Sequence, residues 1–325
     1  MLYVVYILHI DAEDYLFCLQ MKSPCSIYTT RRFQVSINAY LQEIFKYWED
    51  SGKNVFTPTD ISVLYEDLKN KRKLLVKTTL SAFIDILLDE FEIQVVNLRF
   101  PARIEKRFCL KGYSKYELAM SLRRNGYLSH ESAAFLHGCI DIEPSNIYLN
   151  YEQTPKPPSK GILTQESIDF AFANKPRKTN NKATIDKIEI YLLNGKHTNH
   201  LGVVNISVFP NKKLRLTSIE RTLIDIAVRP VYAGGVKSAL SIYKKASNLL
   251  SINTITKMLR QLKYVYPYHQ AIGFYLDKTG QYSSKELSPL CNMGLDFDFY
   301  LSNCISSKEY SSKWRIYYPT DLEKP

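Results

Sequence analysis

Within about 75 residues, three stretches of helical apolar spacing are followed by two β-rich runs, and this order constrains the fold more than any other feature. Leucine, isoleucine and aromatic residues recur every three or four positions in the stretches 37–49, 61–68 and 80–91. The β-rich runs 93–100 and 106–110 follow them, separated by a short turn. This order predicts a winged helix-turn-helix domain over residues 36–110. A small α+β domain that mediates protein contacts fits the same order.

Local signals mark the ends of these helices. Thr57 precedes Pro58, so a cap residue and a first-turn proline open the second helix. Thr78 or Thr79 is the expected cap of the third helix, and Gly52 is expected to end the first.

The charge of the chain is distributed unevenly. It has 43 Lys and Arg against 32 Asp and Glu, a formal net charge of +11. Residues 1–110 carry 14 basic and 14 acidic side chains, whereas residues 111–325 carry 29 and 18. The stretch 156–215 alone holds eleven basic residues against four acidic ones. Such an excess is typical of proteins that bind a polyanion, and no basic amphipathic helix with an aromatic face points to a membrane.

The N-terminal domain offers three groups of side chains to DNA. In the winged helix motif the start of the third helix enters the major groove, and the hairpin tip reaches the backbone or minor groove. The predicted contacts are Lys77, Thr78, Thr79 and Ser81 on the third helix, Lys71, Arg72 and Lys73 before it, and Arg103, Lys106 and Arg107 at the hairpin tip. Asp85 and Asp89 would repel phosphates, and the basic run can equally be a solvated turn. The stretch 156–215 is expected to add phosphate contacts.

From residue 111 onward the pattern changes to a mixture of strands and helices. Strands are predicted at 147–150, 188–193 and 203–209, and helices at 117–125, 129–138, 217–228, 236–250 and 255–262. The mixture predicts a larger α+β domain with a mixed sheet over 111–325. The Pro-rich run 151–161 and the polar, basic segment 174–181 are predicted loops. Residues 1–35 are expected to form an N-terminal extension, with 1–20 either an extra strand or outside the native protein.

Four blocks of the second region stand in an order found in a known family. They are 127–138, 216–225, 230–236 and 266–280. With the domain that precedes them, residues 36 to about 285 resemble the AbiEi antitoxins, predicted transcriptional regulators of phage abortive-infection operons. The resemblance implies a repressor that binds double-stranded operator DNA of its own operon, with a dimer on DNA as one arrangement. It also implies an antitoxin domain that counteracts AbiEii, a nucleotidyltransferase-like toxin, without a stable complex.

The same blocks supply candidate antitoxin residues, namely Glu220, Arg221, Asp225, Gly234 and Gly235. Each of these residues can also be explained by a purely structural role. Arg221 and Asp225 stand four apart, which suits a pair that merely supports a helix, and the run from Thr217 to Glu220 has the pattern of a capping box. The two glycines suit a tight turn or a phosphate cradle before a helix. A different class of function stays open: an antitoxin that has lost DNA binding and neutralises its toxin by direct contact.

The sequence contains no complete motif of a metal site or of an enzymatic active site. His197 and His200 have the spacing of half a metal site, but no further ligand stands at a suitable distance. His130 and His137 are associated with no nucleophile. A metal-dependent nuclease would need an acidic dyad that the sequence around Glu189 lacks. We therefore expect no catalytic residues, no metal and no cofactor.

The cysteines and the apolar runs bear on localisation. Six cysteines without a C-x-x-C pattern are expected to be reduced thiols, which indicates a cytoplasmic protein. No apolar run reaches the ~18 residues of a membrane span, and residues 1–19 lack the features of a secretory signal.

Overall fold

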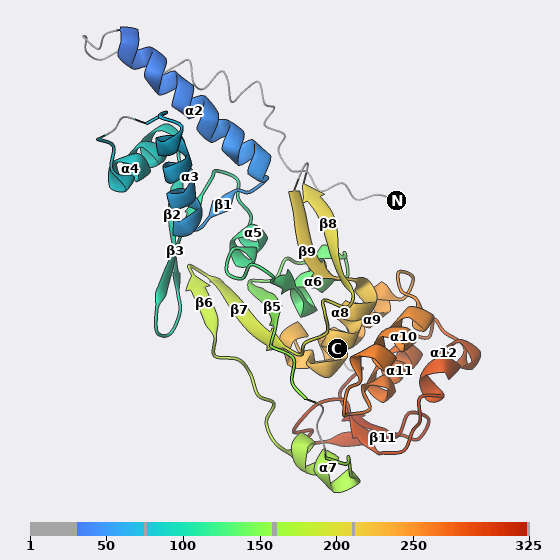
Figure 1. The fold of residues 1–325 in the computed structure, drawn as a ribbon. Coiled ribbons are helices and arrows are strands. Elements are labelled where there is room, and N and C mark those ends of the chain that lie inside the picture. The colour runs from blue at the N-terminus through green and yellow to red at the C-terminus, as the bar shows by residue number, and fades with distance from the viewer. Residues whose placement is uncertain (1–30, 75–76, 158–160, 210–211, 324–325) are drawn as a thin grey trace.

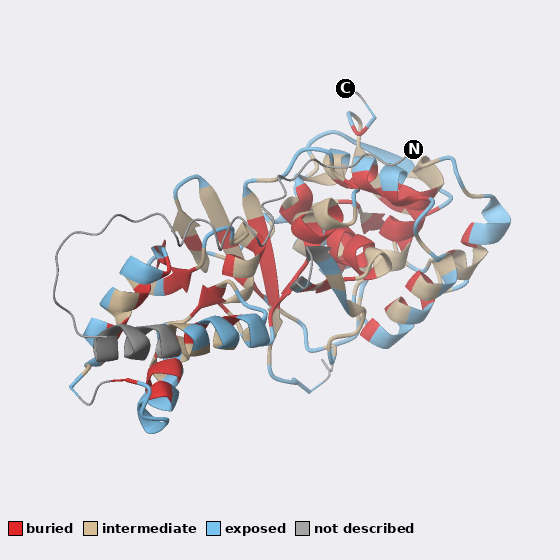
Figure 2. Ribbon diagram, turned by 90° about the horizontal axis from the view of Figure 1, so that it is seen from above, coloured by how far each residue is buried: buried red, intermediate tan, exposed pale blue. Residues whose placement is uncertain are grey.

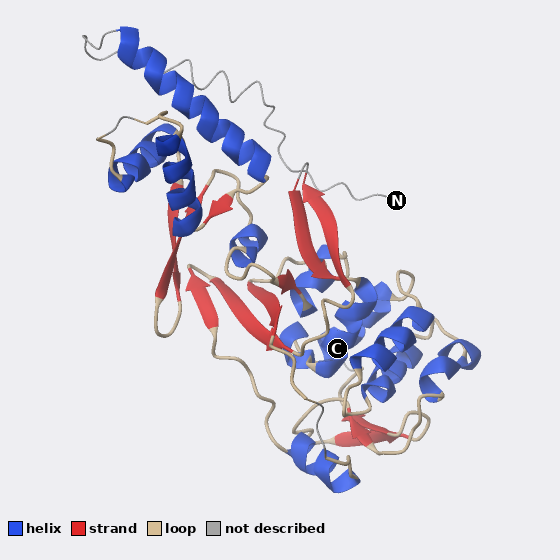
Figure 3. Cartoon of the chain, viewed as in Figure 1, coloured by secondary structure: helices blue, strands red, loops and turns tan. Residues whose placement is uncertain are grey.

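The computed structural model describes residues 31–323 apart from 75–76, 158–160 and 210–211. The extension predicted at 1–35 therefore lies outside the described residues, except for its last five. The fold is a mixed α/β arrangement, as the sequence predicts. One group of helices lies at one end, the strands of the large sheet lie in the middle, and a larger group of helices lies at the other end with a small three-stranded sheet (Figures 1 and 3). Within the described part, no helix is long and apolar enough to cross a bilayer.

The N-terminal part contains three helices and three strands. They follow the order α2 (Arg31–Ser51), β1 (Val55–Phe56), α3 (Pro58–Asn70), α4 (Leu80–Glu90), β2 (Gln94–Arg99) and β3 (Ile104–Cys109). Helix α2 is longer at its start than the predicted 37–49. All three helices pack around one apolar core, whose fully buried side chains include Ile44, Leu64 and Phe83.

Capping side chains set the starts of α3 and α4. Thr57 accepts a hydrogen bond from the Asp60 backbone N–H at 3.1 Å, and the Asp60 carboxylate accepts one from the Thr57 N–H at 2.7 Å. The Thr79 hydroxyl accepts from the Ala82 N–H at 3.2 Å. Both predicted caps are confirmed, with Thr79 rather than Thr78 as the cap of α4.

The second part alternates helices and strands. Its first half contains α5 (Lys115–Met120), β4 (Tyr127–Leu128), α6 (His130–Leu136), β5 (Asn146–Glu152), α7 (Gln165–Ala173), β6 (Lys182–Ile185), β7 (Ile188–Gly195), β8 (Val203–Phe209) and β9 (Lys212–Thr217). Its second half contains α8 (Ile219–Val228), a 3-10 turn (Pro230–Ala233), α9 (Val236–Ala246), α10 (Ile252–Leu262), α11 (Tyr268–Lys278), α12 (Ser284–Cys291), β10 (Phe299–Tyr300), β11 (Lys308–Ser311) and β12 (Ile316–Pro319).

One sheet of nine strands joins the two parts, in the order β1-β3-β2-β6-β7-β5-β4-β9-β8. Strands β5 and β7 run parallel, and so do β4 and β9, whereas the other pairs of this sheet are antiparallel. The hairpin β2–β3 enters the sheet through the pairing of Arg99 with Thr184. A division of the chain at residue 110 stays a prediction, because this hairpin contacts elements on both sides of it.

A second core lies under the sheet and a third lies among helices α8 to α12. Buried residues run from the central strands into this helix group (Figure 2). The largest fully buried side chain is Trp314, which packs against Gly273 of α11. A Cβ atom at position 273 would stand 2.0 Å from the indole ring, so only glycine allows this contact.

Several predicted boundaries are wrong. Helix α5 ends at Met120 rather than at 125, and α9 ends at Ala246 rather than at 250. The cap of α8 is Ser218, whose hydroxyl accepts from the Arg221 N–H, so the capping box predicted at Thr217 lies one residue too early. Thr217 instead ends β9, where its buried hydroxyl bonds that of Thr222. The loop predicted at 174–181 is confirmed.

The contact between Gly273 and Trp314 leads to the first prediction. Gly273→Ala should lower the free energy of unfolding by about 2 kcal/mol or more, because the added methyl group overpacks a rigid ring. Gly280→Ala is the matched control: it has open space but a φ of +69°, so strain of about 1 kcal/mol is expected. Urea denaturation of both variants measures the difference. Equal losses would contradict the packing argument.

Candidate functional site

The segment 71–81 joins α3 to α4 and carries most of the predicted DNA contacts. Its cationic and hydroxyl side chains Lys71, Arg72, Lys73, Lys77, Thr79 and Ser81 are exposed, and Thr78 is half-buried. Two of these cations have acidic neighbours: Lys71 pairs with Asp67 at 2.7 Å, and Lys73 lies 3.8 Å from Glu43. These seven predicted residues therefore lie on both sides of residues 75–76, which the structure does not describe, and six of them are exposed.

Backbone geometry holds the start of this segment. The Arg72 N–H donates to the Lys69 carbonyl and the Lys73 N–H donates to the Leu68 carbonyl, which closes the end of α3. Arg72 has a φ of 56°, a left-handed conformation that favours glycine and costs an arginine about 1 kcal/mol. Glycine would therefore be more stable than arginine in this backbone conformation.

The face of α4 that follows is less favourable to DNA. Asp85, Asp89 and Glu90 are exposed along this helix, in agreement with the repulsion expected from the sequence. Any groove contact is therefore confined to the first turn, where the helix dipole also favours an anion.

The hairpin residues are arranged differently from the prediction. Arg103 lies in the turn, with its guanidinium 3.9 Å from the centre of the Phe100 ring and 2.7 Å from Glu105. Lys106 is exposed on β3. Arg107 is not at the tip: it pairs with Val96 in mid-strand and is 5% exposed. The placement of Arg107 at the hairpin tip is therefore wrong.

Arg107 is held by partners within the protein. Its Nε donates to the Ser121 hydroxyl at 2.9 Å, and one terminal nitrogen donates to Glu105 at 2.8 Å. Burial alone would raise the pKa of Glu105, but the hydrogen bonds from Arg107 and Arg103 lower it below its usual value. Because the guanidinium is buried and hydrogen-bonded to Ser121 and Glu105, it is not available to bind a phosphate.

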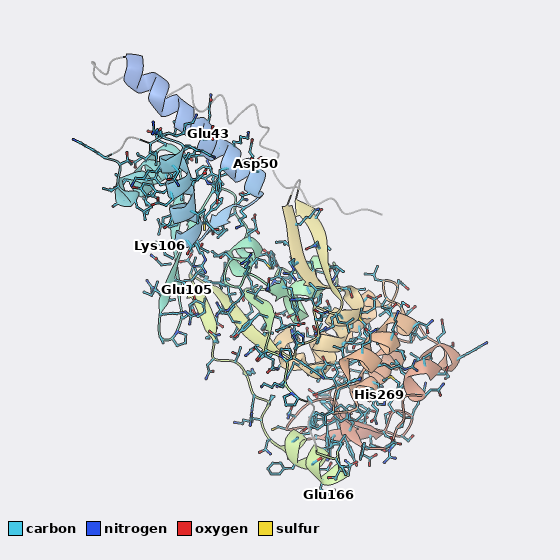
Figure 4. All side chains as sticks on the ribbon, in the orientation of Figure 1. Glu43, Asp50, Glu105, Lys106, Glu166 and His269 are labelled. Carbon is cyan, nitrogen blue, oxygen red and sulfur yellow. The ribbon has the colours of Figure 1, made fainter. Side chains whose placement is uncertain are left out.

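The hairpin turn also lies away from the α3–α4 segment. It points toward β6, at the opposite end of β2 and β3 from the start of α4 (Figure 1). Glu105 and Lys106 lie along the same strand pair (Figure 4). The structure thus does not bring the hairpin residues to the residues of 71–81.

The candidate antitoxin residues of α8 belong to a buried polar network. Arg221 and Asp225 are 3% and 7% exposed, and the Arg221 Nε donates to the Asp225 carboxylate at 2.9 Å. A terminal nitrogen of Arg221 donates to the Leu201 carbonyl at 2.7 Å. Burial disfavours the charged guanidinium, but attraction from Asp225 and neighbouring tyrosines outweighs it and raises the pKa of Arg221. The Glu220 carboxylate accepts from the Ser251 N–H, which ties α8 to the start of α10.

Residues 196–202, which connect β7 to β8, contact this network through the Leu201 carbonyl. Glu152, at the end of β5, accepts from the backbone N–H groups of Thr198 and His200 at 3.0 Å each. Asn199 and His200 both have positive φ values, 54° and 55°, so the connection is strained and depends on these bonds. Burial alone would raise the pKa of Glu152, but the hydrogen bonds from Thr198 and His200 lower it below its usual value.

The two glycines form a tight turn. Gly234 and Gly235 have φ values of 74° and 93°, and the backbone N–H groups of both donate to the Pro230 carbonyl. Because these N–H groups are already used, the turn interpretation is favoured over the phosphate cradle.

The histidines show no metal cluster. In the part of the chain that the structure describes, no group of three potential ligands is assembled. His130 is buried beside Ser129 and Tyr232, and burial lowers its pKa to about 4, so it is neutral at pH 7. His137 hydrogen-bonds the Thr217 carbonyl at 2.7 Å. Both histidines therefore have packing or bonding roles.

Comparison with known proteins gives a likeness of fold. The chain matches no known protein family and no curated protein. Among solved structures it is similar to the crystal structure of the RV2827C protein from Mycobacterium tuberculosis, with a TM-score of 0.54 and 12% sequence identity. The similarity covers 86% of this chain and 91% of that one. At this identity the likeness concerns the fold alone.

The buried pair leads to a second prediction. Arg221→Met should lower the free energy of unfolding by about 3 kcal/mol or more, because Asp225 would then be a buried charge without its cation. The double variant Arg221→Met, Asp225→Leu should recover most of that loss. Chemical denaturation of the single and double variants measures the coupling between the two side chains. If the double variant loses as much stability as Arg221→Met and Asp225→Leu lose in sum, the two side chains are not coupled and the prediction is wrong.

Glu152 leads to a third prediction, on pH. Because its pKa is lower in the folded chain than the ordinary 4.5, the carboxylate stabilises the fold above that pH and less as the pH falls below it. The stability advantage of the wild type over Glu152→Gln should therefore shrink as the pH falls below 4.5. Thermal unfolding of both chains at a series of pH values tests this. An advantage that stays constant would rule out the proposed role of the charge.

Proposed function

We propose that this protein is a DNA-binding repressor of its own operon that also acts as the antitoxin of a nucleotidyltransferase-like toxin in phage defence. The observation that carries the DNA-binding part is the exposed segment 71–81, with four cations leading into the Thr79-capped start of α4. The antitoxin part rests on the AbiEi-like blocks of residues 127–280.

The order and pairing of the N-terminal elements support a winged helix-turn-helix. Strand β1, between the first two helices, pairs with β3, and β3 pairs with β2 after the third helix. This is the arrangement in which α4 would act as recognition helix. We propose that the first turn of α4 enters the major groove, while Lys71, Arg72 and Lys73 contact phosphates.

The hairpin is not part of this proposed interface. Its turn is directed toward β6, and Arg107 is buried, so the wing contacts expected from the sequence are left out. Arg103 and Lys106 remain exposed and can add only non-specific attraction to phosphates at long range.

The acidic face of α4 favours a second candidate function. With Asp85, Asp89 and Glu90 exposed, this helix suits a basic protein surface as well as it suits DNA. In that case the chain would be an antitoxin that blocks its toxin by direct contact. A gel shift on the promoter of the chain's own gene, beside co-purification with the product of the neighbouring gene, separates the two functions.

A fourth prediction concerns the phosphate contacts. Replacing Lys71, Arg72 and Lys73 by glutamine in the full chain should weaken binding to every duplex and reduce the slope of log K against log salt by about 3 at most. Glutamine at the exposed positions Lys244, Lys285 and Lys308 is the matched control, and the slope should stay unchanged there. Titrations at several salt concentrations measure both. The same slope in both variants would place the phosphate contacts elsewhere, for example in 156–215.

A fifth prediction concerns base recognition. Ser81→Ala should reduce the ratio of operator to random-DNA affinity by about threefold, with the salt slope unchanged, because a hydroxyl contact to a base carries no charge. Thr79 is left intact because its loss would remove the helix cap and cost about 1 kcal/mol of stability. Ser241→Ala on α9 is the control. A discrimination ratio that does not change would exclude Ser81 from the groove.

A further inference from the structure

Two pockets flank the segment that ends α10 and leads into α11. The first has a volume of about 420 Å³ and is lined by Lys196, His197 and Lys263 together with uncharged residues. The second has a volume of about 290 Å³ and is lined by a run of aromatic side chains that includes Tyr264 and Tyr266. Lys263 lines both, so the two pockets are adjacent.

The first pocket is cationic and lacks a lining carboxylate. The Lys196 ammonium donates to the carbonyls of Leu262 and Lys263 at 2.6 and 3.0 Å, which fixes it at the end of α10. Burial and the charge of Lys263 lower the pKa of Lys196. The Glu152 carboxylate lies 3.3 Å from His197 Nδ1, but its side chain is only 6% exposed and accepts hydrogen bonds from the backbone N–H groups of Thr198 and His200. An anion placed between the two ammonium groups would relieve their repulsion.

Two residues with left-handed backbone line the first pocket. Lys263 has a φ of 44° at the C-terminal cap of α10, a position where glycine is usual. Asn199, on the opposite part of the lining, has a φ of 54°. Asparagine tolerates this conformation, whereas a left-handed lysine costs about 1 kcal/mol, and such costs are often found at binding sites.

The second pocket supplies flat apolar walls. The Tyr264 ring packs edge-on against Tyr268 at 5.4 Å, and the Lys196 ammonium lies 5.5 Å from the centre of the Tyr264 ring. Val265, also in the lining, is 57% exposed, and the tyrosines beside it are half-buried. His269, at the start of α11, lies in the same helix group (Figure 4). Aromatic walls of this kind stack against heterocyclic bases with little sequence preference.

We propose that the two pockets together bind one nucleotide unit, with its phosphates at Lys196, His197 and Lys263 and its base in the aromatic pocket. Asp296 lines the aromatic pocket and can accept a hydrogen bond from the exocyclic amino group of a base. The unit is either a free nucleoside triphosphate or the terminal residue of a single strand, since both present phosphate next to a base. The site is separate from segment 71–81 and does not depend on operator binding.

Calorimetric titration of the full chain tests the proposal. The probes are the four ribonucleoside triphosphates, a nucleoside, inorganic tripolyphosphate and a 5′-phosphorylated single-stranded RNA pentamer. At least one triphosphate or the pentamer should bind at about 1 mM or below, with one site per chain, and at least tenfold more tightly than the nucleoside or tripolyphosphate alone. Tighter binding of the triphosphates would identify the free nucleotide, and tighter binding of the pentamer the strand end.

Lys263→Gly is the decisive variant, because glycine suits the left-handed position and the chain should fold at least as stably. Its affinity for the bound probe should fall about tenfold through loss of one charged contact, while Lys257→Gln, an exposed lysine of α10, should bind like the wild type. Unchanged affinity in Lys263→Gly would overturn the proposal. So would the absence of binding by every nucleotide probe, or tripolyphosphate bound as tightly as the nucleotides.

Discussion

Strands β1 and β3 each contribute side chains to two hydrophobic cores, and this sharing attaches the N-terminal helices to the rest of the molecule. Successive residues of a strand face opposite sides, so Phe108 packs with the three helices while Cys109 packs under the large sheet. Phe56 and Val55 on β1 divide in the same way. An isolated fragment ending at residue 110 would expose the apolar side chains of Val96, Leu98 and Phe100. Such a fragment would not reproduce the stability of this region in the intact chain. The hairpin thus acts as a structural joint rather than as a free arm.

A second constraint lies where the parallel strands β5 and β7 end. Glu152 and Arg221 come from distant parts of the chain, and both bond the connection 196–202, including the Thr198 hydroxyl. The same connection supplies one wall of the cationic pocket. A buried charge without its partner is costly, so these residues are needed for the geometry of the pocket wall without contacting a ligand themselves. Arg221 and Asp225 of α8 therefore have a physical role in the fold.

The sequence predicted what depends on neighbouring residues. The caps at Thr57 and Thr79 and the strand 203–209 follow from local spacing, and they agree with the structure. The failures concern long-range contacts. The sequence suggests that Arg107 is an exposed cation, but in the structure it is buried and hydrogen-bonds Ser121, fourteen positions away. Strand β6 is too short and polar for periodicity to find, because its pairing with β2 and β7 defines it. The pockets beside α10 combine residues more than sixty positions apart, so no local pattern marks them.

Hydrogen–deuterium exchange of the full chain, with and without the duplex upstream of its own gene, tests the central claim most directly. Exchange reports on each segment separately, so it distinguishes the α3–α4 segment from the hairpin and from the basic stretch 156–215. Peptides covering 71–82 should exchange more slowly when the duplex is bound, with no change across strand β3, residues 104–109. Protection confined to 156–215, or protection of the hairpin without the segment 71–82, would contradict it.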